Sequence, residues 1–221
     1  MSAAKRAIDP IAVAARKLGY VARSALKLVE LDDKFRLLRS KSRILDLGCA
    51  PGAWIQACCA RGEKHTEVLG VDLQDVELSG MRYIDEARVR TLVRDAHEAT
   101  LNELGGAHSF DLILSDMMAN TSGIASVDAA ASLHLAECAV DVAMSRGGGE
   151  GALRLRGDLV VKILEGDGSV EALVAACKPV CQAKLVQTEG DAKREQGNLS
   201  SCSRADVVTR LTVGCQYQTS I

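Results

Sequence analysis

Short apolar segments alternate with segments of helical periodicity along most of the chain. The pattern predicts strands over 43–47, 67–72, 89–95, 110–116, 159–164, 183–187 and 206–213, and helices over 10–39, 52–62, 97–104, 126–145 and 168–177. Strands that alternate with helices are typical of a parallel sheet covered on both faces. The pattern therefore predicts an α/β fold with a mostly parallel, seven-stranded sheet.

The junction between the first predicted strand and the next helix reads RILDLGCAPGAW over residues 43–54. Open α/β sheets bind nucleotide-like ligands at such a junction, beyond the carboxyl end of a strand. Three residues separate Gly48 from Gly52, so the dinucleotide fingerprint is absent, and no phosphate-loop motif occurs. A glycine-rich loop without phosphate-binding chemistry suits a nucleoside without phosphate, such as S-adenosylmethionine. An ordinary turn without a ligand is the alternative.

Three predicted strands end in an acid, at Asp72, Asp95 and Asp116. The carboxyl ends of parallel strands meet at one edge of a sheet, so we expect these carboxylates to converge. Asp72 can accept hydrogen bonds from ribose hydroxyls, Asp95 can accept from an exocyclic amine, and Asp116 can complement a sulfonium charge. Each acid alone could equally be a helix cap or a turn residue.

Lys162 interrupts the apolar segment LVVKIL at 159–164. Burying an ammonium group is costly unless it is paired or deprotonated. Burial favours the uncharged amine, which can act as a base. We therefore consider Lys162 a candidate general base, with a lysine that extends to solvent from a strand end as the alternative.

The charge is distributed unevenly along the 221 residues. Residues 1–45 carry a net charge of +7, whereas the whole chain carries −2. A basic segment on an acidic body is a candidate contact surface for nucleic acid, although a solvated helical face explains it equally well. We expect one domain overall, with a basic helical segment over residues 1–42 packed on a core over 43–221.

Neither metal binding nor a membrane span is predicted. None of the eight cysteines forms a C-x-x-C pair, and most lie in apolar stretches. They are expected to be reduced core residues, which favours a reducing compartment. No run of eighteen apolar residues occurs.

Taken in order, several stretches resemble the FtsJ-like (RrmJ-like) ribose 2′-O-methyltransferases. The resemblance extends from about Asp9 to Leu211, and the matching stretches are 19–28 (GYVARSALKL), 45–54 (LDLGCAPGAW), 69–72 (LGVD), 111–117 (DLILSDM) and 159–164 (LVVKIL). It implies a Rossmann-like, S-adenosylmethionine-dependent methyltransferase fold. The pattern looks most like the branch that modifies a uridine of large-subunit ribosomal RNA in bacteria and mitochondria.

The resemblance also implies a partner and a location. The partner is large-subunit ribosomal RNA, within a pre-ribosomal particle. The location is mitochondrial or cytoplasmic, with the mitochondrion favoured.

The resemblance also implies roles for single residues. The family carries a Lys-Asp-Lys-Glu tetrad, whose first three members fall on Lys27, Asp116 and Lys162. Lys162 is the expected base, Asp116 orients it, and Lys27 orients the hydroxyl or holds a flanking phosphate. The expected cofactor-binding residues are Gly48, Pro51, Gly52, Ala53, Trp54, Asp72, Asp95, Ala96 and Asp116.

Three departures from the family pattern bear on activity. The usual DMAPN after the fourth strand reads DMMAN at 116–120, and an insertion over 147–158 precedes the Lys162 strand. The fourth tetrad member falls on Ala205 in strict register, or on Asp206 with a shift of one residue. We predict Asp206, because adjacent strand residues face opposite sides and Ala205 offers no polar group.

The sequence is compatible with two other functions. One is a catalytically weakened protein of the same fold that acts as a ribosome assembly factor, which the departures favour. The other is a small-molecule methyltransferase, against which the basic segment and Lys162 argue.

Overall fold

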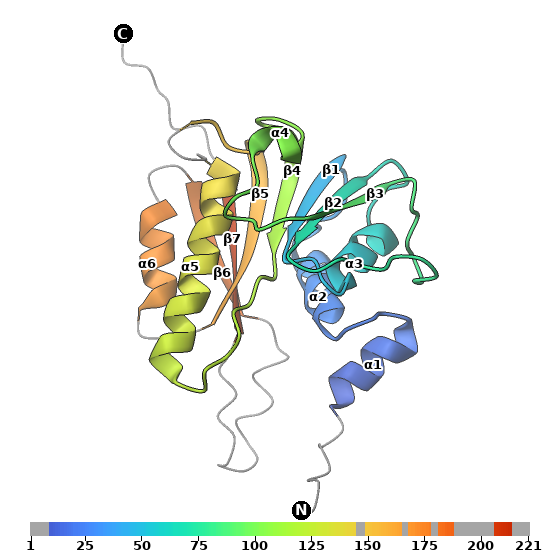
Figure 1. Cartoon of the computed structure of the whole chain (residues 1–221), viewed down its shortest axis with the longest axis horizontal. Helices are drawn as coiled ribbons and strands as arrows, with labels where there is room; N and C mark the ends of the chain where they lie inside the picture. The colour runs from blue at the N-terminus through green and yellow to red at the C-terminus, as the bar shows by residue number, and fades with distance from the viewer. Residues whose placement is uncertain (1–8, 145–148, 165–167, 178–180, 188–205, 214–221) are drawn as a thin grey trace, which may run out of the picture.

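The computed structural model describes residues 9–144, 149–164, 168–177, 181–187 and 206–213, which form one sheet with helices on both faces (Figure 1). The helices are α1 (Pro10–Leu18), α2 (Ser24–Phe35), α3 (Ala53–Arg61), α4 (Leu101–Leu104), α5 (Ala125–Met144) and α6 (Ser169–Cys177). The strands are β1 (Arg43–Leu47), β2 (Glu67–Asp72), β3 (Val89–Val93), β4 (Phe110–Ser115), β5 (Leu153–Leu164), β6 (Cys181–Gln187) and β7 (Asp206–Val213).

The sheet has seven strands in the order β3-β2-β1-β4-β5-β7-β6. Strands β1 to β5 pair in parallel, and β7 runs antiparallel to both β5 and β6. The predicted mostly parallel α/β fold is therefore confirmed. The strand order reverses at β1, which pairs with β2 on one side and β4 on the other, and open sheets bind ligands in the crevice at such a switch point.

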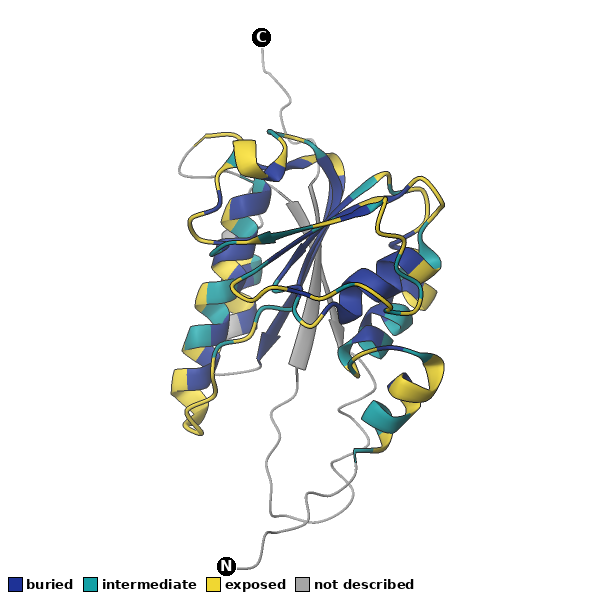
Figure 2. Cartoon of the chain, turned by 45° about the vertical axis from the view of Figure 1, so that its right-hand side comes forward, coloured by how far each residue is buried: buried dark blue, intermediate teal, exposed yellow. Residues whose placement is uncertain are grey.

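Strand alternation divides the core into two layers, one on each face of the sheet. In β5, Val160 belongs to the cluster formed with α1, α2 and α3, whereas Val161 and Ile163 belong to the cluster formed with α5 and α6. The central strands β1 and β4, and β5 from Gly157 onward, are almost entirely buried (Figure 2). Because both faces are covered, a polar side chain inside a central strand needs a partner or a function.

Two helical segments are shorter than predicted. The helix expected over 10–39 is interrupted after Leu18, where Gly19 adopts a left-handed conformation with φ of 90° and caps α1 through its backbone N–H. The chain then enters α2 at Ser24. The helix expected over 97–104 contains only the single turn of α4, which a Thr100–Glu103 capping box starts.

The strand predicted over 159–164 is longer in the structure, because β5 already begins at Leu153, within the insertion noted over 147–158. The extra length is accommodated by a register shift in the pairing with β4 between Phe110 and Leu112. Residues 154–156 are exposed and lie within this shift, between Leu153, which pairs with Phe110, and Asp158, which pairs with Leu112.

A buried glutamine connects three segments that lie far apart in the sequence. Gln56 on α3 is 1% exposed. Its Oε1 accepts from Val21 N at 2.7 Å, and its Nε2 donates to Gly19 O at 3.1 Å and to Arg82 O at 2.9 Å. These bonds fix the turn between α1 and α2, and with it the start of α2.

We expect Gln56→Ala to lower the free energy of unfolding by about 2–3 kcal/mol, because it leaves buried backbone groups unpaired and opens a small cavity. Urea denaturation followed by circular dichroism measures the effect. Gln74→Ala is the matched control, since Gln74 is exposed. A loss below about 0.5 kcal/mol in Gln56→Ala would contradict this role.

Candidate functional site

A cleft of about 800 Å³ opens at the carboxyl ends of β1, β2 and β4, beside the start of α2. The glycine-rich loop, the strand-end acids and the two predicted tetrad lysines, Lys27 and Lys162, all line this cleft. Its lining residues are Ala22, Arg23, Ser24, Lys27, Gly48, Ala50, Pro51, Val71, Asp72, Leu73, Gln74, Arg94, Asp95, Ala96, His97, Asp116, Met117, Met118, Ala119, Asn120, Leu135 and Lys162.

The loop after β1 is held against β2 by backbone hydrogen bonds. Gly48 N and Cys49 N both donate to Val71 O, at 2.8 and 3.3 Å. Gly48 has a φ of 75°, and a Cβ there would lie 2.7–2.9 Å from atoms of Met117. Only glycine therefore allows the loop to pass so close to the segment that follows β4.

Asp72 fixes the other side of this loop. Its Oδ2 accepts from Ala50 N and its Oδ1 accepts from Gln74 N, each at 2.9 Å. Since each carboxylate oxygen can accept two hydrogen bonds, Asp72 retains capacity for hydroxyl donors in the cleft.

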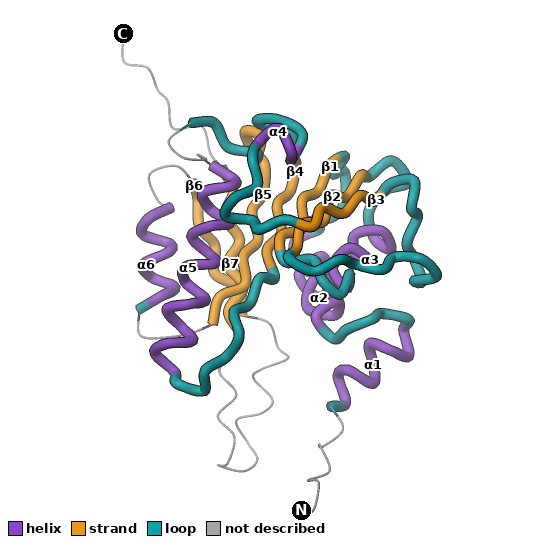
Figure 3. The backbone as a smooth tube through the Cα atoms, in the orientation of Figure 1, coloured by secondary structure: helices purple, strands orange, loops and turns teal. Residues whose placement is uncertain are grey.

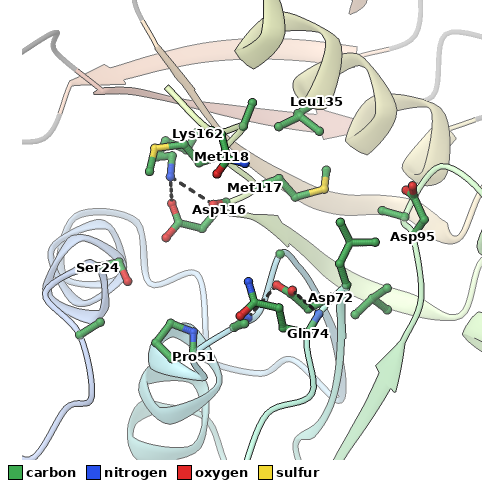
Figure 4. A pocket seen from close by; sticks show the side chains of 18 of the residues that line it. Ser24, Pro51, Asp72, Gln74, Asp95, Asp116, Met117, Met118, Leu135 and Lys162 are labelled. Carbon is green, nitrogen blue, oxygen red and sulfur yellow. Dashed lines mark hydrogen bonds and ion pairs between the residues drawn. The ribbon is translucent and has the colours of Figure 1, made fainter. Parts of the chain in front are cut away.

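Asp95 and Ala96 lie at the far end of the cleft, after β3. The Asp95 Oδ1 accepts from His97 N at 2.9 Å, which orders the turn, and Ala96 is buried beside it. The three predicted strand-end acids thus line one cleft, as Figure 4 shows for Asp72, Asp95 and Asp116.

Lys162 and Asp116 form a nearly buried ion pair at the opposite end of the cleft (Figure 4). Lys162 is 7% exposed, and its Nζ donates to the Asp116 Oδ1 and to the Asp116 carbonyl oxygen, the latter at 3.1 Å. Asp116 N donates to Leu47 O at 3.1 Å, which anchors the acid to β1. This pairing explains how an apolar strand tolerates a lysine. Lys27 lines the same cleft from α2.

The candidates for the fourth tetrad position are only partly described. Ala205 lies outside the described residues, and Asp206 is the first residue of β7. The backbone register pairs Asp206 with Leu164, which shares a face of β5 with Lys162. The register is compatible with Asp206 near the cleft, and its role stays a prediction.

Three predicted cofactor residues lie behind the wall of the cleft and do not line it. Gly52 N donates to Cys49 O at 2.6 Å, and Ala53 is buried. Trp54 is 2% exposed, and its Nε1 donates to Ser24 O at 2.9 Å. Trp54 therefore attaches the start of α2 to α3, and direct contact of these three residues with a cofactor stays a prediction.

Sequence reasoning missed Asp46, an acid in the middle of β1. It is fully buried, and neither of its carboxylate oxygens has a hydrogen-bond partner among the described residues. Burial, together with the charges of Asp116 and Asp72, raises the pKa of Asp46 well above its usual range. The signal was the one used for Lys162, an ionisable residue inside an apolar strand.

Several absences concern only the described part of the chain. There, no three His, Cys, Asp or Glu residues lie close enough to hold a metal ion, and no helix is both long and apolar enough to cross a membrane. The side chains of Cys49, Cys58, Cys59, Cys138 and Cys177 are buried.

Comparison with known proteins gives consistent matches in sequence. Residues 20–199 match the FtsJ-like methyltransferase family. The "Ribosomal RNA large subunit methyltransferase E" of Gluconobacter oxydans is 38% identical over 171 residues, which cover 77% of this chain and 59% of that protein. The protein of the same name from Desulfatibacillum aliphaticivorans is 33% identical over 185 residues, covering 82% of this chain and 83% of that protein.

Solved structures share the fold at lower identity. A chain described as a ribosomal RNA methyltransferase from Plasmodium falciparum superimposes with a TM-score of 0.66 at 21% identity, covering 88% of this chain and 98% of that one. A chain described as a hemolysin from Lactococcus lactis reaches 0.58 at 18% identity, covering 88% and 89%. The fold alone therefore does not identify an activity.

We expect Asp46→Asn to gain stability relative to the wild type as pH rises above about 4. Above the unfolded-state pKa of about 3.9, the folded wild type retains a proton that the unfolded chain releases. The free energy of unfolding of the wild type then falls by up to about 1.4 kcal/mol per pH unit, until the pH passes the folded-state pKa of Asp46. The asparagine variant has no proton to release at this position, so it does not show this loss.

Urea titrations between pH 4 and 8 measure this difference. Asp141→Asn, at an exposed position of α5, is the control and should run parallel to the wild type. Parallel curves for Asp46→Asn and the wild type would contradict the assignment.

Proposed function

Because the chain belongs to the FtsJ-like methyltransferase family, we propose that it transfers a methyl group from S-adenosylmethionine to a ribose 2′-hydroxyl of large-subunit ribosomal RNA, at a uridine. The observation that carries the proposal is the buried Lys162–Asp116 pair facing a cleft lined by strand-end acids. The names of the bacterial relatives support ribosomal RNA as the substrate. The match spans 59% of the length of the Gluconobacter relative and 83% of the Desulfatibacillum one.

The residues of the cleft fit S-adenosylmethionine. Its volume of about 800 Å³ lies within the usual range for small-molecule sites. We assign the ribose hydroxyls to Asp72, the adenine to Asp95 and Ala96, and the sulfonium to Asp116. The cofactor, when bound, supplies a methyl group that is already electrophilic.

The chain's own task is then to position the acceptor and remove its proton. The Asp116 carboxylate holds the Lys162 Nζ at the cleft. Lys27 lines the same cleft and would orient the hydroxyl or hold a flanking phosphate. The neutral Lys162 amine can then accept the proton of the 2′-hydroxyl while the oxygen gains the methyl group.

RNA binding is assigned to the basic N-terminal helices. Arg16 and Lys17 are exposed on α1, and Arg23 lies at the cleft, where it forms an ion pair with Asp9 at 2.7 Å. An RNA strand whose phosphates contact these cations would approach the acceptor position from the side of α1.

The assembly-factor alternative is not favoured, because Lys27, Asp116 and Lys162 all line one cleft and the named relatives are methyltransferases. The finer assignments belong to the proposal. They are a substrate within a pre-ribosomal particle, a role in ribosome biogenesis, and a reducing compartment, mitochondrial or cytoplasmic, which the buried cysteines support.

Transfer of tritiated methyl from S-adenosylmethionine tests the proposal. Large ribosomal subunits and their protein-free RNA serve as substrates, and the label is mapped by nuclease digestion. The proposal expects label in an alkali-resistant dinucleotide, the mark of a 2′-O-methylated ribose. Label on a base, or no label with either substrate, would contradict it.

We expect Lys162→Ala to slow methyl transfer by about 10²–10⁴-fold with S-adenosylmethionine affinity nearly unchanged, because a general base is lost. Lys41→Ala is the matched control. Lys41 also pairs with a buried acid, Asp158, at 2.9 Å, but it lies beside the amino end of β1. Single-turnover transfer and calorimetry separate the two effects. A wild-type rate in Lys162→Ala would remove this residue from the mechanism.

Charge reversal of Arg16, Lys17 and Arg23 to Glu is expected to weaken RNA binding and to flatten its dependence on salt by about two units of slope. Filter binding between 50 and 300 mM salt measures both. Reversal of Lys64 and Arg90, exposed near the amino ends of β2 and β3, is the control. An unchanged slope in the triple variant would locate the RNA surface elsewhere.

A further inference from the structure

The loop between β4 and α5 presents a large apolar side chain beside the Lys162–Asp116 pair. Met118 lines the cleft and is 59% exposed. Figure 4 draws it beside the Lys162–Asp116 pair. A single exposed apolar residue is ordinary on a protein surface, so its meaning depends on how it is held and on what reaches it.

This loop, residues 117–124, is anchored at both ends (Figure 3). At the start, Asp116 N donates to Leu47 O. At the end, the buried Asp128 carboxylate accepts from Ser122 N at 2.7 Å and from Ser122 Oγ at 2.6 Å. The loop is therefore preorganised with Met118 facing the cleft before any partner binds.

The covalent geometry of a nucleotide brings a base to this position. In a ribose, the base is attached to C1′, the neighbour of the C2′ atom that carries the acceptor hydroxyl. Met118 follows Asp116 by two residues, so their Cα atoms lie within about 7.6 Å. A hydroxyl within reach of Lys162 therefore brings its own base within reach of Met118.

We infer that Met118 packs its thioether against the nucleobase of the methylated nucleotide; this inference rests on the proposed function. A thioether attracts the edge or face of an aromatic ring but provides no pattern of donors and acceptors. Met118 therefore holds the base in place without reading its identity, and the ribose hydroxyl is presented to Lys162.

The family pattern quoted above does not supply this contact. In the DMAPN sequence of the resemblance, the position of Met118 carries Ala, whose methyl group is too short for such a contact. The next position carries Pro, where this chain has Ala119. Met118 is thus followed by Ala119, where the family pattern has the rigid ring of proline.

The test compares Met118→Ala and Met118→Leu with Ile124→Ala, in full-length protein with large-subunit RNA or subunits as substrate. Ile124 is equally exposed, at 59%, and lies on the same loop, but it does not line the cleft. We expect Met118→Ala to lower kcat/KM for RNA by about 2- to 10-fold. Met118→Leu should restore most of the loss, Ile124→Ala should match the wild type, and all should bind S-adenosylmethionine equally.

A second arm uses RNA with an abasic site at the mapped nucleotide. Wild type and Met118→Ala should then transfer methyl at the same rate, because the partner of Met118 is gone. Unchanged transfer by Met118→Ala on intact RNA, an equal loss on abasic RNA, or weaker cofactor binding that accounts for the loss would each overturn the inference. Absence of transfer by the wild type would overturn the proposed function itself.

Discussion

The site depends on one buried ion pair. A lysine in a central strand covered on both faces is unfavourable unless a carboxylate compensates its charge, and Asp116 does so for Lys162. Asp116 in turn is attached to β1 through Leu47. The pair therefore joins β1, β4 and β5 at their carboxyl ends, and it holds Lys162, the proposed proton acceptor, at the cleft beside the point where the strand order reverses.

The side of the cleft formed by α2 is held in place by residues that do not line the cleft. Gln56 binds the turn before α2, and Trp54 binds the backbone of Ser24. Both lie on α3, directly behind the glycine-rich loop. Through these two residues, α3 fixes the start of α2 and with it the position of Lys27 relative to Lys162.

The fold was predictable because each central strand is a short apolar segment with a clear end. The strand-end acids were predictable for the same reason, since parallel strands bring their carboxyl ends together. Trp54 was predicted as a cofactor residue from its place in the loop motif, but its environment depends on α2, 30 residues away in sequence. Asp46 was overlooked because its apolar neighbours suggested an ordinary strand. The start of β5 at Leu153 was not predicted, because the exposed Arg154 and Arg156 interrupt the apolar pattern before the predicted strand.

The most direct test of the central claim is a crystal structure with S-adenosylhomocysteine. We expect the ribose hydroxyls on the Asp72 carboxylate, the adenine beside Asp95 and Ala96, and the sulfur facing the Lys162–Asp116 pair. A ligand bound outside this cleft, or bound with its sulfur turned toward Asp95, would contradict the account.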